Sequence, residues 1–188
     1  HISLNGTDIS TLSQNRLHEQ IAFVQQRAFL FKGTIRSNLQ VGKPDATEDE
    51  MWHALEIAQA SKFVNELDKG LDSIVEHNGA NFSGGQRQRL AIARAIIKPA
   101  AIYIFDDSFS ALDFKTDANL RKALSNDAKI GQSIVIIVAQ RIATVTTANQ
   151  IIVLDEGKNI GHGTHAELKE SNSTYQEIIK SQLKGEDI

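Results

Sequence analysis

The sequence predicts an α/β domain in which helices flank a mostly parallel sheet and an α-helical subdomain is inserted into the sheet-based core. Continuous apolar runs of strand length recur along the chain, at 21–24, 101–105, 133–138 and 151–154. Segments of helical pattern separate these runs, which is typical of parallel strands buried on both faces. Residues 42–97 are dominated by helical pattern, which indicates the inserted subdomain and leaves 1–41 and 98–188 for the core.

The composition is that of an ordinary globular domain. The chain has 188 residues, 41% hydrophobic and 23% charged, with a net charge of −3, so no basic surface for nucleic acid is indicated. The absence of cysteine excludes a disulfide framework. The longest apolar run, 134–139, is far shorter than the roughly 18 residues typical of a membrane span.

The N-terminal segment predicts a hairpin, a short helix and a strand. Residues 2–9 read as a hairpin turning at Asn5-Gly6, and Ser10 is expected to cap a helix that continues to about residue 18. The strand 21–24 follows, and a helical turn is expected at 34–39. The chain begins as if a strand were already under way and has no initial methionine, so we expect it to be a fragment.

Capping signals define the helices of the inserted subdomain and of the C-terminal part. Thr47 and Glu50 form a capping box at the start of a helical pattern over 45–67, and Thr164 with Glu167 repeats it near the C-terminus. Residues 71–81 are expected to be irregular. The remaining predicted elements are helices at 115–124, 142–146 and 175–183, between and after the last three strands.

A glycine-containing loop, Ser83-Gly84-Gly85-Gln86, opens a long helix. Ser83 can cap that helix, and the glycines allow backbone N–H groups to approach an anion at its N-terminus. A Ser-Gly-Gly sequence alone is equally explained by a plain helix cap. The basic run at 87–89 and the acidic strand end one helix later favour an anion site.

Three predicted strands end on polar side chains. Asp106 and Asp107 follow the strand 101–105, Gln26 follows 21–24, and Gln140 follows 133–138. Asp106 or Gln26 can hold Mg²⁺, and the second acid, on the opposite side of the strand, can face a reacting phosphate. Each of these polar residues could by itself be a solvated strand end. Their recurrence at three strands favours one magnesium-phosphate site.

Together these residues resemble the nucleotide-binding domain of ATP-binding cassette (ABC) exporters, a P-loop NTPase-like fold. The resemblance identifies residues 82–86 as the signature loop, 102–106 as the Walker B strand and 110–113 as the D-loop. It implies ATP and Mg²⁺ as ligands, Gln26 and Asp106 at the metal, Asp107 and Gln140 at the catalytic positions, and Ser83, Gly84, Gly85, Gln86 and Asp113 at bound nucleotide. The resemblance covers essentially the whole chain.

The chain departs from the family pattern at three places. No G-x-x-x-x-G-K-[ST] occurs, so the resemblance implies that the chain starts after that loop and that the fragment alone is inactive. Asp107 stands where the family has glutamate, and Gln140 stands where it has histidine. Both changes fall on the chain's own site, while the signature loop, which serves a partner's site, is intact.

The resemblance implies the degenerate half of a heterodimeric exporter. The partners would be a second nucleotide-binding domain and a transmembrane domain upstream in the same polypeptide, with this soluble part at the cytoplasmic face of the membrane. No nucleic-acid partner is expected. Two alternatives remain open: a non-hydrolysing module that uses ATP for dimerisation or regulation, and a soluble ABC ATPase of DNA repair or translation.

Overall fold

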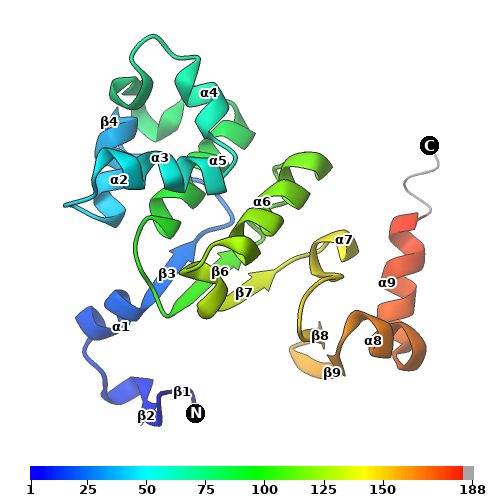
Figure 1. Cartoon of the computed structure of the whole chain (residues 1–188). Helices are drawn as coiled ribbons and strands as arrows, with labels where there is room; N and C mark the ends of the chain where they lie inside the picture. The colour runs from blue at the N-terminus through cyan, green and yellow to red at the C-terminus, as the bar shows by residue number, and fades with distance from the viewer. Residues whose placement is uncertain (184–188) are drawn as a thin grey trace. The chain divides into compact units, whose positions relative to one another are not determined.

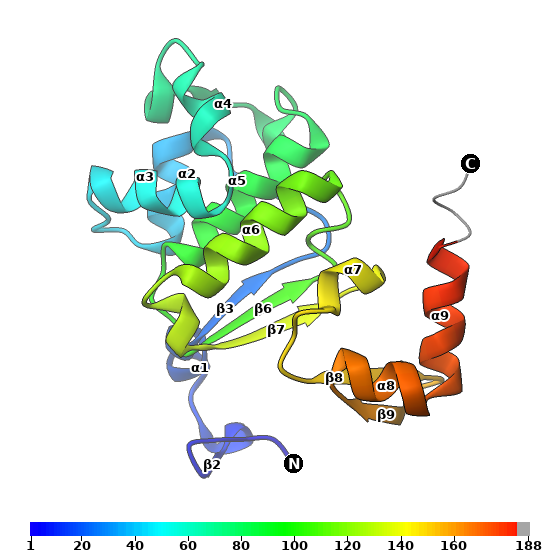
Figure 2. The ribbon, with the colours of Figure 1, turned by 45° about the vertical axis from the view of Figure 1, so that its right-hand side comes forward.

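The computed structural model describes residues 1–183, in two compact units that divide between residues 138 and 139 (Figures 1 and 2). The strands of the first unit are β1 (Ser3–Leu4), β2 (Thr7–Asp8), β3 (Ile21–Val24), β4 (Gly33–Thr34), β5 (Ile74–Val75), β6 (Ile102–Asp106) and β7 (Ile134–Val138). Its α-helices are α1 (Gln14–Gln20), α2 (Ile35–Gly42), α3 (Glu48–Ile57), α4 (Ser61–Asn65), α5 (Gly84–Ile96) and α6 (Phe114–Asn126). Short 3₁₀ turns lie at Ile9–Thr11, Gly70–Asp72, His77–Gly79 and Ile130–Gln132.

A three-stranded parallel sheet forms the centre of this unit, in the order β3-β6-β7 (Figure 2). In one row of the register, Ala22 is opposite Tyr103, which is opposite Val135. All three carboxyl ends therefore point the same way. The prediction of an α/β fold with a mostly parallel sheet is confirmed.

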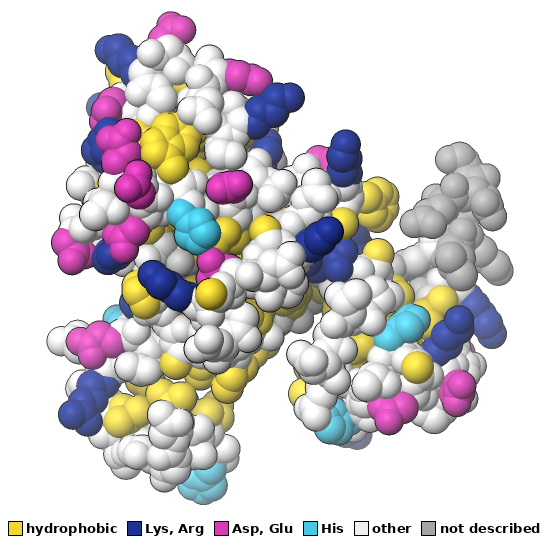
Figure 3. Space-filling model, viewed as in Figure 1, with side chains coloured by type: hydrophobic (Ala, Val, Ile, Leu, Met, Phe, Trp, Pro, Cys, Tyr) yellow, Lys and Arg dark blue, Asp and Glu magenta, His cyan; other side chains and the backbone are white. Residues whose placement is uncertain are grey.

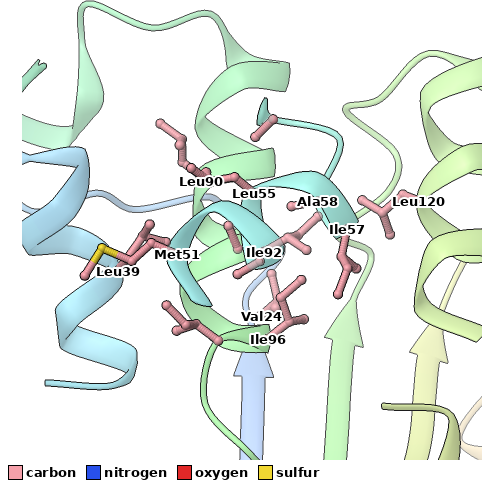
Figure 4. Close-up of a cluster of buried hydrophobic side chains, with 14 of the residues drawn as sticks. Val24, Leu39, Met51, Leu55, Ile57, Ala58, Leu90, Ile92, Ile96 and Leu120 are labelled. Carbon is pink, nitrogen blue, oxygen red and sulfur yellow. The ribbon is translucent and has the colours of Figure 1, made fainter. Parts of the chain in front are cut away.

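One face of the sheet is buried under helices. Ala22, Val24, Tyr103 and Phe105 alternate along β3 and β6 and are each at most 4% exposed. Val24 lies among side chains from α3, α5 and α6, including Ile57, Ile96 and Leu120 (Figure 4). Strands β3 and β6 and helix α5 therefore pack against the same continuous core.

The other face of the sheet is open, which differs from the expectation of strands buried on both faces. Phe23, Ile134, Ile136 and Val138 are 45% to 59% exposed, and no element of the first unit covers them. Hydrophobic side chains are accordingly visible at the surface in the space-filling view (Figure 3). Continuous apolar strands are typical of two covered faces, but within residues 1–138 only one face is covered.

The helical region is built from α2, α3, α4 and α5. The predicted capping box of α3 is present: Thr47 Oγ1 accepts from the Glu50 N–H, and Glu50 accepts from the Thr47 N–H. The single helical pattern over 45–67 is divided into α3 and α4 because Gln59 takes a left-handed backbone conformation, with φ of 58°. A long helix cannot continue through such a residue.

The N-terminal hairpin is confirmed, with Ser3 opposite Asp8 and Leu4 opposite Thr7. The expectation that Ser10 caps the following helix is wrong. Ser13 is the N-cap of α1, and Asp8 instead caps the 3₁₀ turn that contains Ser10. The Asp8 carboxylate accepts from the Ser10 N–H, so Ser10 lies inside this turn and the start of α1 is capped by Ser13.

The second unit contains α7 (Ile142–Val145), β8 (Ile151–Asp155), β9 (Lys158–Gly163), α8 (His165–Ser171) and α9 (Ser173–Leu183). β8 and β9 form an antiparallel hairpin, and β9 was not expected from the sequence. Ile151, Val153, Leu168 and Tyr175 form a small core of their own. The capping box of Thr164 and Glu167 is confirmed at the start of α8.

Candidate functional site

The carboxyl ends of β3 and β6 bring two of the predicted site residues into contact. Gln26, two residues beyond β3, donates from Nε2 to Oδ2 of Asp107 over 3.0 Å. A carboxylate only accepts, so this bond identifies the NH₂ group of the amide as the atom facing Asp107. The amide oxygen of Gln26 is then the atom able to bind a cation or accept from water.

Asp107 lies at a sharp turn directly after β6. Its φ is 43°, a left-handed conformation that Asp adopts more readily than most residues. Its N–H donates to the carbonyl of Val138 over 2.9 Å, which ties the turn to the end of β7. Asp106, the last residue of β6, lies on the open face in register with Val138. The two acids therefore occupy different positions, Asp106 at the end of the strand and Asp107 in the turn after it.

Ser108 is a buried neighbour of the two acids that was not predicted from the sequence. It is 1% exposed, and its Oγ donates to the carbonyl of Val24 over 3.1 Å and lies 3.2 Å from that of Asp106. The hydroxyl thereby joins the end of β3 to the end of β6. A serine immediately after two acids at a strand end was the available signal.

The loop 83–86 forms the first turn of α5 and has its own capping box. Ser83 Oγ accepts from the Gln86 N–H over 3.2 Å, and Gln86 Oε1 accepts from the Ser83 N–H over 2.9 Å. Phe82, only 6% exposed, anchors the loop in the core, while Ser83 and Gly84 are exposed. The positive end of a 13-residue helix is thus presented at the surface.

Arg89 binds this loop through a backbone carbonyl group. This contact was not predicted from the sequence. Its guanidinium donates to the carbonyl of Gly85 over 3.2 Å and to that of Gln59 over 2.7 Å. It also lies 4.8 Å from the ring centroid of Phe63. Burial lowers the pKa of Arg89, although the nearby charge of Asp113 opposes that shift.

Asp113 is the N-cap of α6. Its carboxylate accepts from the Thr116 N–H over 2.9 Å and from the Thr116 hydroxyl over 2.7 Å, and these bonds lower the pKa of Asp113. The loop before it passes close to the start of α5, since a Cβ built on Gly85 would lie 3.4 Å from the carbonyl oxygen of Ala111. The predicted nucleotide residue therefore has a structural task as well.

Gln140 belongs to the second unit and is exposed. Its carbonyl accepts from Nε2 of Gln182 over 2.6 Å, and the N–H of Ile142 donates to Oε1 of the same side chain over 2.8 Å. The loop between β7 and α7 is therefore bound to α9.

The residues at the strand ends fit a divalent cation whose coordination shell is completed by other ligands. Among residues 1–183, no group of three or more His, Asp or Glu side chains is placed to enclose a metal. Asp106 offers a carboxylate and Gln26 an amide oxygen, which suits Mg²⁺ because that ion keeps water and phosphate ligands. Within the same described residues, no helix has both the length and the apolar character needed to cross a bilayer.

Comparison with known proteins identifies the kind of protein to which this chain is similar. Residues 1–110 match the family described as ABC transporter. An ABC transporter ATP-binding protein of Mycobacterium tuberculosis is 47% identical over 184 residues, which are 96% of this chain and 31% of that protein. An ATP-dependent lipid A-core flippase of Desulfotalea psychrophila is 39% identical over 181 residues, again 96% of this chain and 31% of the flippase.

A solved structure agrees with these sequence matches. The structure of a bacterial Atm1-family ABC exporter with ATP bound superimposes with a TM-score of 0.90 at 32% identity, covering 95% of this chain and 31% of that one. The chain thus spans about a third of the length of the proteins to which it is similar.

Proposed function

The chain belongs to the ABC transporter family, and we propose that it is the degenerate nucleotide-binding half of a heterodimeric exporter. In this proposal its own site holds ATP with little turnover. The loop 83–86 completes the active site on the partner domain. Exporter-type relatives over nearly the whole chain support the class of protein, and the site residues support the division of tasks.

One observation carries the proposal: the acid at the catalytic position is short and already bonded. Asp107 is one methylene shorter than the glutamate of the family pattern, and its Oδ2 accepts from Gln26 over 3.0 Å. A carboxylate that is withdrawn by about 1 Å from a reacting water can cost roughly 100-fold in rate. Gln140 adds to this loss of rate. An amide can donate a hydrogen bond, but unlike histidine it cannot relay a proton or become positively charged.

Each side chain then has a defined part in the chain's own site. Asp106 and the amide oxygen of Gln26 would hold Mg²⁺, which supplies positive charge to the phosphates of ATP. Asp107 accepts a hydrogen bond, from Gln26 or from a water, and Gln140 donates to a phosphate oxygen. Ser108 keeps the ends of β3 and β6 together, and the residues that follow these strands, Gln26 and Asp107, stay in contact.

The loop 83–86 is suited to a phosphate presented by another molecule. Ser83 and Gly84 are exposed at the N-terminus of α5, and the capping box fixes their backbone. Exposed N–H groups at the positive end of a helix attract an anion. In the proposed dimer that anion is the terminal phosphate of ATP on the partner domain, with Asp113 beside it.

The rest of the transporter follows from the same proposal. A transmembrane domain in the same polypeptide would carry the substrate, and the nucleotide-binding domain would work at the cytoplasmic face of the membrane. The known lengths agree with this, since the chain spans only 31% of the flippase and of the Atm1-family exporter. No basic surface for a nucleic acid is indicated by the net charge of −3.

An ATPase assay on the full heterodimer tests the proposal with three single variants. Ser83→Ala should lower turnover more than Asp107→Ala does, because Ser83 serves the active site and Asp107 the weak one. Thr47→Ala is the matched control, since it removes the same kind of capping box, from α3, away from the nucleotide. The asymmetric assignment is wrong if Asp107→Ala lowers turnover as much as Ser83→Ala.

A non-hydrolysing module is the second candidate, and the bond between Gln26 and Asp107 favours it for this chain's own site. In that case neither site of the assembly turns over, and ATP serves only to hold the dimer together. Ser83→Ala would then weaken ATP-dependent dimerisation without changing a hydrolysis rate. Measuring both dimerisation and phosphate release on the same variant separates the two functions.

A further inference from the structure

A side chain near the C-terminus binds the loop that carries Gln140 at two points. Gln182, on α9, uses both ends of its amide: Nε2 donates to the carbonyl of Gln140 over 2.6 Å, and Oε1 accepts from the N–H of Ile142 over 2.8 Å. The two bonds fall on either side of Arg141. A two-point contact of this kind fixes both the position and the direction of the backbone between them.

The helix that follows Gln140 depends on this contact for its start. α7 has only four residues, and its N-cap, Arg141, makes no side-chain capping bond. The first N–H groups of a helix have no partner within the helix and need an acceptor from elsewhere. For Ile142, the first residue of α7, the acceptor is Gln182, forty positions later in the chain.

Gln182 is itself well supported. α9 is anchored by Tyr175, which is 2% exposed and whose hydroxyl lies 2.9 Å from Nδ1 of His165 on α8. A second glutamine on α9, Gln176, donates to the carbonyl of Lys169 over 2.8 Å. The helix that presents Gln182 is therefore bound to the core of its unit at several points.

We propose that Gln182 is a positioning residue for Gln140, so that α9 sets how firmly this chain holds the terminal phosphate of ATP. The inference rests on the proposed function, in which Gln140 donates to that phosphate. Gln182 acts only through the backbone of residues 140–142. The ligand class is a nucleoside triphosphate, as distinct from a diphosphate.

The first test measures the contact between Gln182 and residues 140–142 directly and does not depend on nucleotide. Gln182→Met keeps the length of the side chain and removes both hydrogen bonds, so hydrogen exchange of the Ile142 amide should become about tenfold faster in the full-length protein. Gln176→Met is the matched control, because it removes an amide-to-carbonyl contact of the same helix with α8. Equal exchange at Ile142 in wild type and Gln182→Met would overturn the inference.

The second test measures the effect on phosphate recognition. The preference of this chain for ATP over ADP is read from competition against photolabelling by 8-azido-ATP. Gln140→Ala should lower that preference by about tenfold, the order expected for a hydrogen bond to a charged group. Gln182→Met should lower it by about threefold, and adding it to Gln140→Ala should have no further effect.

The outcomes separate the two proposals. Loss of preference in Gln140→Ala with no change in Gln182→Met overturns the positioning role alone. If the preference for ATP over ADP is unchanged in Gln140→Ala while exchange at Ile142 is faster in Gln182→Met, the phosphate contact of Gln140 is refuted. The functional role of the Gln182 contact is then refuted with it. Gln182→Glu keeps the acceptor for Ile142 and loses the donor to Gln140, so an intermediate loss supports the two-point contact.

Discussion

Ser108→Ala tests whether one buried hydroxyl joins the two strand ends of the site. The Oγ atom donates to the carbonyl of Val24 over 3.1 Å and lies 3.2 Å from that of Asp106, and the residue is 1% exposed. Alanine removes only the oxygen, so packing of the Cβ is kept. The substitution therefore isolates the contact between β3 and β6.

The magnitude follows from the burial of the lost contact. A hydrogen bond contributes about 1 kcal/mol net, and a buried carbonyl left without a partner costs about 1–3 kcal/mol. We expect the free energy of unfolding to fall by about 2 kcal/mol. For the unfolding of a single domain of this length, that corresponds to a decrease in Tm of about 4–8 °C.

Thermal and urea unfolding of the full-length protein measure this change, with Ser110→Ala as the matched control. Ser110 lies in the same loop and donates to the carbonyl of Asp107 over 2.8 Å, but it is exposed. Its substitution should change the free energy of unfolding by about 0.5 kcal/mol or less. Equal effects of the two substitutions would refute the role assigned to the buried hydroxyl of Ser108.

Three further substitutions test the packing and the electrostatics of the first unit. Gly42→Ala should destabilise the protein by about 3 kcal/mol or prevent folding, because its Cβ would lie 2.1 Å from the carbonyl oxygen of Arg94. Leu55→Ala, at a side chain that is 0% exposed, should lower the free energy of unfolding by about 3 kcal/mol in urea denaturation. Thr116→Val removes the side-chain hydrogen bond, one of several hydrogen bonds that depress the pKa of Asp113, so that pKa should rise toward its ordinary value of 3.8 in an NMR titration. Because the folded pKa is the lower one, the stability from this cap is complete above pH 3.8 and is lost as the pH falls through the folded value.

Gly42→Ala and Leu55→Ala each have a control at a less constrained position. Gly157→Ala meets no atom within 4 Å and carries only the strain of a φ of +76°, so it should cost about 1 kcal/mol. Val41→Ala, at a 56% exposed side chain, should cost about 0.5 kcal/mol or less. The packing explanations are wrong if Gly42→Ala lowers the free energy of unfolding no more than Gly157→Ala does, or Leu55→Ala no more than Val41→Ala does. An unchanged pKa of Asp113 in Thr116→Val would contradict the electrostatic explanation.

Local signals in the sequence predicted most of the elements. The capping boxes at Thr47 and Thr164, and the Ser83 cap, lie within four residues of the helices they start, so side chain and backbone are read together. The strands β3 and β6 follow from short apolar runs bounded by polar residues. These features depend on neighbours along the chain.

The features that were missed depend on neighbours in space. β9 has the sequence Lys-Asn-Ile-Gly-His-Gly, with little strand propensity of its own, and it forms because β8 pairs with it. Gln59 ends the helix because its φ is positive, and a positive φ cannot be predicted from a glutamine in the sequence. Near the N-terminus, Asp8 accepts from the Ser10 N–H, which places Ser10 inside a turn and leaves the cap of α1 to Ser13.

The candidate site shows the same division. The sequence identified Gln26, Asp106 and Asp107 as polar strand ends, but the bond between Gln26 and Asp107 joins residues 81 positions apart. Ser108 and Arg89 act on carbonyl groups of distant segments, so their contributions appear only in the folded chain. Residue type located the chemistry, and the pairing of strands determined which residues meet.

The contact of Gln182 with the loop at Gln140 also constrains the order of events during synthesis. A ribosome adds about 5–20 residues per second, and the N-terminal part of a chain folds first. The acceptor for the first N–H of α7 is encoded forty residues downstream, so β3, β6 and β7 can pair while this loop still lacks its anchor. The loop that carries Gln140 is therefore completed only after α9 has been made, among the last steps in the maturation of the domain.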